Sequence, residues 1–197
     1  MRKVVVTGGP GAGKTALLET VRRHFCEHVV VLPEAASILY GGGFPRNPDA
    51  ATQRAAQRAI YHVQRELEEI AEAHADTHLV LCDRGTLDGI AYWPEGPDTW
   101  FRDLGTSLEA EYARYYAVIH LRTPAKRNGY NHQNPLRIES ANQAAAIDQR
   151  IAEIWSKHPR RLVIEAQDEF IQKVKRAIEL IRELAPNCVH LRAEASP

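Results

Sequence analysis

The sequence has little of what secreted and membrane proteins need. Its 197 residues include three cysteines, Cys26, Cys82 and Cys188, an odd number spaced too widely to indicate a disulfide framework. No apolar run is long enough to span a bilayer, and the chain opens on a short β-branched stretch without the layout of a signal peptide. We therefore expect a cytoplasmic protein whose thiols are reduced and which has no membrane partner.

An excess of charge of either sign is also missing. The 25 basic residues equal the 25 acidic ones, so the chain as a whole produces no field that would favour nucleic acid as a partner. Internal repeats and low-complexity tracts are absent as well. A length of 197 residues with 44% hydrophobic content is typical of one soluble globular domain, which we expect to span residues 1–197.

What the sequence does contain is a glycine-rich stretch that reads G-x-x-x-x-G-K-T, formed by Gly8, Gly9, Pro10, Gly11, Ala12, Gly13, Lys14 and Thr15. The run Lys3–Val6 before it is typical of a buried strand, and the residues after it have helical composition. In this context the glycines let backbone N–H groups converge on phosphate oxygens at the start of a helix. Lys14 is expected to reach the β- and γ-phosphates, and the Thr15 hydroxyl to bind Mg²⁺. The stretch therefore predicts a nucleoside triphosphate site.

Alternating strands and helices predict an α/β fold. Four further buried strands are predicted at Val29–Leu32, Leu79–Cys82, Ala117–Leu121 and Leu162–Ile164, and Cys188–Leu191 could add a short edge strand. The longest predicted helix follows Asp49 as its N-cap and has an apolar stripe expected to face the core, formed by Ile60, Val63, Leu67 and Ile70. Because parallel strands need crossover connections, we expect a three-layer P-loop NTPase fold, with helices on both faces of a five-stranded parallel sheet.

Charged residues follow the ends of three predicted strands. Glu34 follows the second strand, Asp83 and Arg84 the third, and Arg122 the fourth. The ends of parallel strands meet at the crevice where ligands bind, so we expect these side chains to converge. In this interpretation Asp83 holds Mg²⁺ or its water shell, Glu34 accepts the proton of an attacking hydroxyl, and Arg84 is a further catalytic candidate. Alternatively, each carboxylate serves only as a helix cap.

Two segments do not fit the alternation of strands and helices. Residues 86–106 contain prolines, glycines and two tryptophans, which predict a long irregular loop that is nevertheless ordered. Residues 122–135 also lack a period, and we interpret the segment 122–140 as a mobile lid over the triphosphate.

Basic side chains gather in this lid segment, namely Arg122, Lys126, Arg127 and Arg137. A solvated basic face is one interpretation. The other is that lid arginines neutralise the charge developing on a transferred phosphoryl group. We expect Arg122 to bind the nucleotide and Arg127 to act in catalysis, although the spacing does not decide which arginine contacts the transferred group.

These features together resemble the P-loop kinases of small molecules, in particular the deoxynucleoside kinase and nicotinamide riboside kinase group and the AAA-type ATPase/kinase-like domains near it. The matching pieces are Gly8–Thr15, Pro33-Glu34, Asp83-Arg84-Gly85, Leu121–Pro124 and Val163–Ala166. The resemblance implies the strand order 2-3-1-4-5 and a Glu34 that acts as base. Deoxynucleoside kinases carry Glu-Arg-Ser where this chain has Asp83-Arg84-Gly85, and they have a more arginine-dense lid.

We therefore expect an ATP-dependent, Mg²⁺-requiring phosphotransferase that moves the γ-phosphoryl group to a hydroxyl of a small, nucleoside-like acceptor. The alternative is a regulatory P-loop ATPase or GTPase that acts as a nucleotide-dependent switch. The second carboxylate and the basic lid favour the kinase, because they suit an acceptor and shield it from water. ATP and the acceptor are the expected partners, and a homodimer is left open.

Overall fold

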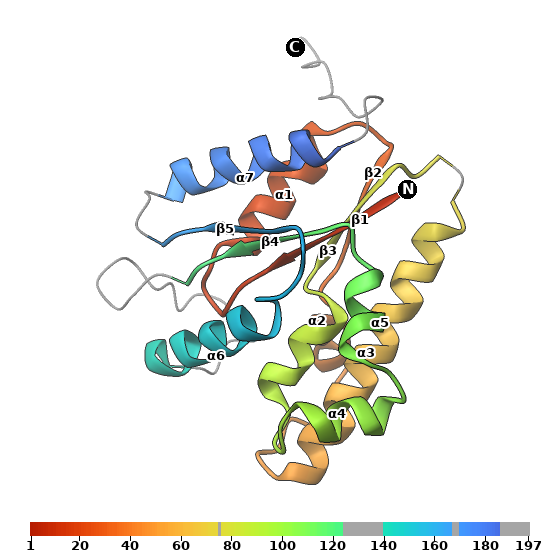
Figure 1. The fold of residues 1–197 in the computed structure, drawn as a ribbon, viewed down its shortest axis with the longest axis vertical. Helices are drawn as coiled ribbons and strands as arrows, with labels where there is room; N and C mark the ends of the chain where they lie inside the picture. The colour runs from red at the N-terminus through yellow and green to blue at the C-terminus, as the bar shows by residue number, and fades with distance from the viewer. Residues whose placement is uncertain (75, 124–139, 167–169, 186–197) are drawn as a thin grey trace.

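The computed structural model describes residues 1–74, 76–123, 140–166 and 170–185 (Figure 1). Its centre is a sheet of five parallel strands, β1 (Arg2–Thr7), β2 (Val29–Leu32), β3 (Leu79–Asp83), β4 (Ala117–Leu121) and β5 (Arg161–Ile164). The strands lie in the order β2-β3-β1-β4-β5, which confirms the order that the family resemblance implies.

Helices cover both faces of the sheet, as the alternation of elements predicted (Figure 1). One face packs against α1 (Lys14–His24) and α7 (Phe170–Leu184). The other face carries α6 (Ala141–Ile154), α3 (Ala50–Glu72) and the short elements α2 (Ala35–Gly41), η1 (Thr86–Tyr92), α4 (Pro97–Leu104) and α5 (Leu108–Ala113).

The central strand β1 shows why the fold needs both layers. Val4 and Val6 belong to the core on the α1/α7 side, and Val5 belongs to the core on the opposite side, with none of the three exposed to solvent. A parallel strand covered on both faces is apolar throughout, because successive side chains point to opposite layers. The β-branched run at the N-terminus therefore specifies a central strand.

The inward face of α3 differs from the expected apolar stripe. Its buried residues are Gln57, Tyr61, Gln64 and Glu68 together with Ala56 and Ala71, whereas Ile70 is 59% exposed. The predicted N-cap is confirmed, because the Asp49 carboxylate accepts a hydrogen bond of 2.9 Å from the backbone N–H of Thr52. The helix was therefore predicted correctly, and Leu67 of the expected stripe packs against the core, but the buried residues of this face are mostly polar.

The segment 86–106 is ordered, as expected, but it is mostly helical and not an irregular loop. The backbone N–H of Gly85 donates to the Asp88 carboxylate at 2.8 Å, which caps η1, and Pro97 begins α4. Trp100 is completely buried and stands edge-on to Tyr61 of α3, with ring centroids 5.4 Å apart. Aromatic packing of this kind orders the segment, although its sequence has no clean period.

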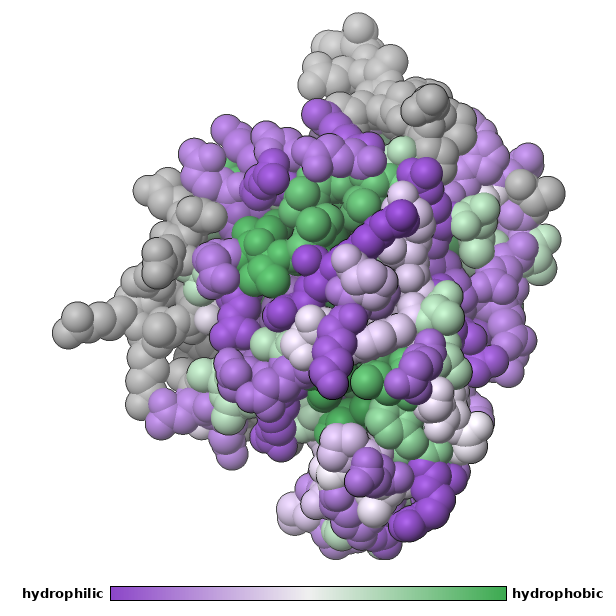
Figure 2. All heavy atoms as spheres, viewed as in Figure 1, coloured by the Kyte–Doolittle hydropathy of each residue, from purple (hydrophilic) through white to green (hydrophobic). Residues whose placement is uncertain are grey.

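Lys126, Arg127, Arg137, most of the predicted lid and the predicted edge strand at 188–191 lie outside the described residues. Among the described residues, no helix has the length and apolarity required to cross a membrane. The face drawn in Figure 2 is mostly hydrophilic, with a hydrophobic area beneath α7 along the edge of the sheet.

A buried carboxylate joins α3 to the sheet. Glu68 is completely buried and accepts hydrogen bonds from Lys3 Nζ at 3.1 Å, Arg114 Nη2 at 2.6 Å and the Tyr115 hydroxyl at 2.7 Å. Its fourth contact is the Gln64 amide at 3.0 Å. A buried charge is tolerated only when it is paired and hydrogen-bonded, and Glu68 meets this condition through three separate elements of the fold.

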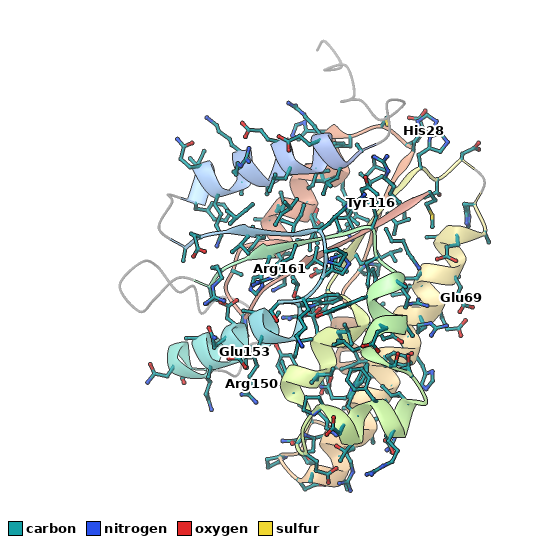
Figure 3. All side chains as sticks on the ribbon, viewed as in Figure 1. His28, Glu69, Tyr116, Arg150, Glu153 and Arg161 are labelled. Carbon is teal, nitrogen blue, oxygen red and sulfur yellow. The ribbon has the colours of Figure 1, made fainter. Side chains whose placement is uncertain are left out.

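We predict that Glu68→Ala lowers the free energy of unfolding by about 3–5 kcal/mol, because it removes the completely buried carboxylate that Lys3 and Arg114 share. Urea unfolding followed by circular dichroism measures the loss. Glu69→Ala is the control, since Glu69 is exposed and labelled at the surface of α3 in Figure 3, and it should change the value by less than about 1 kcal/mol. Equal losses in the two variants would contradict the structural role of Glu68.

Candidate functional site

The phosphate loop connects β1 to α1 and is closed on itself by Lys14. Lys14 is the first residue of α1, and its buried Nζ donates to the carbonyl oxygens of Gly8 at 2.8 Å and Gly9 at 3.2 Å. Burial, followed by the nearby charge of Arg84, lowers the pKa of Lys14 to about 8. The ammonium group is therefore held over the loop in the charged form that would contact phosphates.

Two of the loop glycines are required by packing. A Cβ atom at Gly8 would lie 2.0 Å from the carbonyl oxygen of Leu121 on β4. At Gly9 it would lie 2.7 Å from Cβ of Asp148 and 2.8 Å from the carbonyl oxygen of Ala144, both on α6. Gly8 also has φ of 135°, a conformation that residues with a side chain rarely adopt. The loop is thus pressed directly against β4 and α6.

Glu34 and Arg84 form an ion pair beside the loop. The Nε of Arg84 donates to Oε1 of Glu34 at 2.6 Å, and the hydroxyl of Ser37 donates to Oε2. Burial alone would raise the pKa of Glu34, but the charges of Arg84 and Lys14 and these hydrogen bonds outweigh it and lower the pKa to about 2. Glu34 is therefore a fixed, ionised carboxylate at neutral pH.

Arg84 adopts the left-handed backbone conformation, with φ of 75°, and it is the only described residue other than glycine with a positive φ. Its Nη1 also lies 3.4 Å from the carbonyl oxygen of Gly8, and its guanidinium lies over the Tyr92 ring at 5.8 Å. Backbone strain of this kind is retained where the surroundings hold a residue in a required position. Here it directs the guanidinium between Glu34 and the phosphate loop.

Asp83 differs from Glu34 because no arginine of the described residues forms an ion pair or hydrogen bond with it. Burial raises the pKa of Asp83 to about 6, in spite of the opposing charge of Lys14, and within the described part of the chain its buried Oδ1 has no hydrogen-bond partner. The Thr15 hydroxyl, on the first turn of α1, is exposed to the same cavity. Two oxygen ligands suit Mg²⁺, which is usually held by one or two protein groups together with phosphates and water. Asp83 and Thr15 therefore fit the predicted metal site.

A cavity of about 560 Å³ lies beside the phosphate loop. The phosphate loop and the start of α1 line it with Pro10, Gly11, Lys14 and Thr15. Glu34 before α2, Asp83 at the end of β3 and Arg84 after it line the same space. Helices α2, α3 and η1 contribute further wall residues, including Tyr40, Gln57, Tyr61, Gln64 and Tyr92. The volume is within the range of small-molecule sites, roughly 300–1,000 Å³. The structure thus brings Lys14, Thr15, Glu34, Asp83 and Arg84 together around one space.

Arg122 lies elsewhere. It does not line this cavity, and its Nε instead lies 3.3 Å from Oδ2 of Asp148 on α6. Arg127 lies outside the described residues, so its predicted role remains a prediction.

The sequence interpretation missed several polar groups of the site. Gln57 and Gln64 come from the inward face of α3, and Asp88 from η1, where it accepts hydrogen bonds from the Thr7 hydroxyl and from Nε1 of Trp155 at 3.2 Å. Asp148 binds the backbone N–H of Gly9 at 2.8 Å. A signal was present in α3, where polar residues recur at helical spacing on one face, but it resembles an ordinary solvated face.

Comparison with known proteins gives the same architecture. Residues 3–173 match the AAA domain family. A thymidylate kinase from Candida albicans superposes with a TM-score of 0.60 at 14% identity over 98% of each chain. A deoxyadenosine kinase from M. mycoides, solved with the products dCMP and a flexible dCDP, gives 0.56 at 13% identity, over 92% of this chain and 99% of that one. No curated protein sequence matches the chain significantly. These likenesses establish a P-loop kinase fold.

We predict that Gly9→Ala lowers the free energy of unfolding by about 1–3 kcal/mol, because the added methyl group must displace α6 from the loop. Guanidinium chloride unfolding measures the change. Gly41→Ala is a suitable control, since a Cβ atom at Gly41 meets nothing within 4 Å, and it should stay within about 0.5 kcal/mol of the wild type. A Gly9→Ala protein as stable as the control would show that the close approach is not required.

Proposed function

Because the chain belongs to the AAA domain family and has the fold of a P-loop nucleoside or nucleotide kinase, we propose that it transfers the γ-phosphoryl group of ATP to a hydroxyl of a small, nucleoside-like acceptor. The observation that carries this proposal is the shared cavity, in which Lys14 and Thr15 of the phosphate loop face the same space as Glu34 and Arg84. A donor phosphate at the loop and an acceptor hydroxyl at Glu34 would therefore face the same space.

The wall away from the phosphate loop suits a flat, polar ring. Tyr40, Tyr61 and Tyr92 provide aromatic surface, and the Gln57 amide, on a residue only 7% exposed, provides a donor and an acceptor. Gln64 donates its amide N–H to Glu68, which fixes the orientation of its carbonyl oxygen. Aromatic faces and oriented amides are the groups that bind a heterocyclic base, and this supports a nucleoside-like acceptor.

Glu34 is the group proposed to receive the acceptor hydroxyl. Its pKa of about 2 makes it a weak base, but it keeps the carboxylate ionised and able to accept a hydrogen bond at any neutral pH. In a loose phosphoryl-transfer transition state, bond formation to the acceptor oxygen is limited, so orienting the hydroxyl matters more than removing its proton early. Arg84 and Ser37 hold the carboxylate in the orientation required.

Charge on the transferred group has several candidate partners. Lys14 and Arg84 supply fixed positive charges beside the loop, and Thr15 and Asp83 would hold Mg²⁺. When bound, the metal neutralises charge between the β- and γ-phosphate oxygens. Arg122 and Arg127 are further candidates on the nucleotide side, as proposed from the sequence.

The test is a screen for the acceptor. Wild-type protein is incubated with γ-labelled ATP, Mg²⁺ and a panel of nucleosides, nucleoside monophosphates and sugars, and labelled products are separated. We predict that Glu34→Gln retains ATP binding and slow background hydrolysis but loses about a hundredfold to ten-thousandfold in transfer to the acceptor that the screen finds. Lys14→Ala is the control for the donor side, because it should lose ATP binding itself.

No labelled product across the panel, together with hydrolysis that is insensitive to Glu34→Gln, would contradict the kinase. That result would favour the alternative, a regulatory NTPase whose acceptor is water.

A second prediction concerns the metal. Asp83→Asn removes a carboxylate charge while keeping its shape. We expect ATP affinity to rise on addition of Mg²⁺ in the wild type and not to rise in this variant. Isothermal titration with ATP in Mg²⁺ and in excess chelator measures this difference without requiring turnover. Asp98→Asn, a change to an acid on α4 outside the cavity lining, is the matched control. The same Mg²⁺ dependence in Asp83→Asn and wild type would remove Asp83 from the metal site.

A further inference from the structure

Two buried side chains of opposite charge connect the phosphate loop to Arg122. Asp148 on α6 is 2% exposed, and its Oδ1 accepts the backbone N–H of Gly9 at 2.8 Å while its Oδ2 lies 3.3 Å from Nε of Arg122. Lys173 on α7 is 5% exposed, and its Nζ donates to the carbonyl oxygens of Ala12, at 3.0 Å, and Arg122. Each side chain thus contacts both the loop and residue 122.

Both the backbone and the guanidinium of Arg122 are held by contacts with other elements. Its backbone N–H donates to the carbonyl oxygen of Ile164 at 2.9 Å, its carbonyl accepts from Lys173, and its guanidinium contacts Asp148 and the Gln149 side chain, the latter at 3.3 Å. The same carboxylate binds the loop through one oxygen and the guanidinium through the other. The Asp148 carboxylate therefore bridges the Arg122 guanidinium and the backbone of the phosphate loop.

A chain of hydrogen bonds through His120 stabilises the ionised state of Asp148. Nε2 of His120, a completely buried residue of β4, lies 3.0 Å from Oδ1 of Asp148, and the Nη2 of Arg161 donates to Nδ1 of His120 at 3.1 Å. Because Nδ1 accepts, Nε2 carries the proton and donates to Asp148. In Figure 3 Arg161 lies between the sheet and α6, where this chain of contacts runs. Burial would raise the pKa of Asp148, but the hydrogen bonds from His120 and from the Gly9 N–H, together with the charge of Arg122, lower it.

A carboxylate directly behind a phosphate-binding loop needs an explanation, since its negative charge opposes a triphosphate. The Arg122 guanidinium neutralises it, and the carboxylate in turn restricts a long side chain that would otherwise lose rotamer freedom on binding. Arginine suits this position because its planar group can contact a carboxylate on one edge and phosphate oxygens on another.

We propose that Asp148 and Lys173 are positioning residues for the ATP site, which hold Arg122 in fixed register with the phosphate loop so that its guanidinium is ready to contact the triphosphate. This inference rests on the proposed function, because it concerns the donor nucleotide. Although α6 and α7 carry no residue of the predicted phosphate loop, they would then contribute to nucleotide affinity through Asp148 and Lys173.

The experiment is a double-mutant cycle on ATP affinity. Isothermal titration with ATP and Mg²⁺ is carried out on wild type, Asp148→Asn, Arg122→Met and the double variant. Asparagine can still accept from Gly9 through its amide oxygen but no longer attracts the guanidinium. We expect Asp148→Asn to weaken ATP binding about tenfold, the effect of losing one oriented charge-assisted contact, and to add nothing in the Arg122→Met background.

Turnover provides a second measurement. Once the acceptor screen has supplied a substrate, Asp148→Asn should raise the KM for ATP and leave the KM for the acceptor within about twofold, a split that a general loss of structure would not produce. Arg150→Gln is the control on the same helix, because Arg150 is exposed and its side chain donates to the Ala146 carbonyl oxygen of α6 itself (Figure 3). It should leave ATP affinity unchanged.

The outcomes separate this inference from the proposed function. Suppose that the wild type binds ATP. If Asp148→Asn does not weaken this binding, or weakens it equally with and without the Arg122 side chain, the inference is overturned and the kinase proposal still stands. Unchanged ATP affinity in Arg122→Met would overturn it as well. If Asp148→Asn unfolds, Lys173→Met is tested in the same cycle, where additivity with Arg122→Met again overturns the inference. A wild type that binds no ATP would overturn both proposals.

Discussion

The close approach of the phosphate loop to β4 and α6 is the constraint on which the rest of the site depends. Gly8 and Gly9 lie so near Leu121, Ala144 and Asp148 that a single methyl group at either position would overlap backbone or side-chain atoms. This contact brings Asp148 within hydrogen-bonding distance of Gly9 and puts Arg122 beside the loop. Glycines in such a loop let phosphates approach the backbone. Here Gly8 and Gly9 are also needed so that β4 and α6 can pack against the loop.

Two carboxylates at the cavity, Glu34 and Asp83, differ in whether an arginine of the described residues binds them. Glu34 binds Arg84 directly and has its pKa lowered to about 2, whereas Asp83, one residue before Arg84 in sequence, is buried without such a bond and has its pKa raised to about 6. Glu34 is thus held in place as an anion, whereas Asp83 has an oxygen without a partner among the described residues, which a cation can bind. This difference supports separate tasks for two acids that look equivalent in the sequence.

Helix α3 combines stability and recognition on one face. Toward one end Glu68 is paired with Lys3 and Arg114 and ties the helix to the sheet, and toward the other Gln57 lines the cavity. Gln64 belongs to both regions, since it lines the cavity and donates to Glu68. A polar inward face is costly unless its groups are hydrogen-bonded, and the bond from Gln64 to Glu68 links the cavity wall to the buried ion pairs.

Local patterns in the sequence determined the strands, the phosphate loop, the Asp49 cap and the residues that follow each strand, because these depend on neighbours a few positions apart. The strand order came from the family resemblance, and the roles of Glu34, Asp83 and Arg84 stay predictions. Only the tertiary structure decided that α3 turns its glutamines inward, and that Asp148 and Lys173 reach Gly9 and Ala12 across 139 and 161 residues of chain. Such pairs leave no local pattern, because each residue alone is typical of a solvated helix face, and only packing brings the two together.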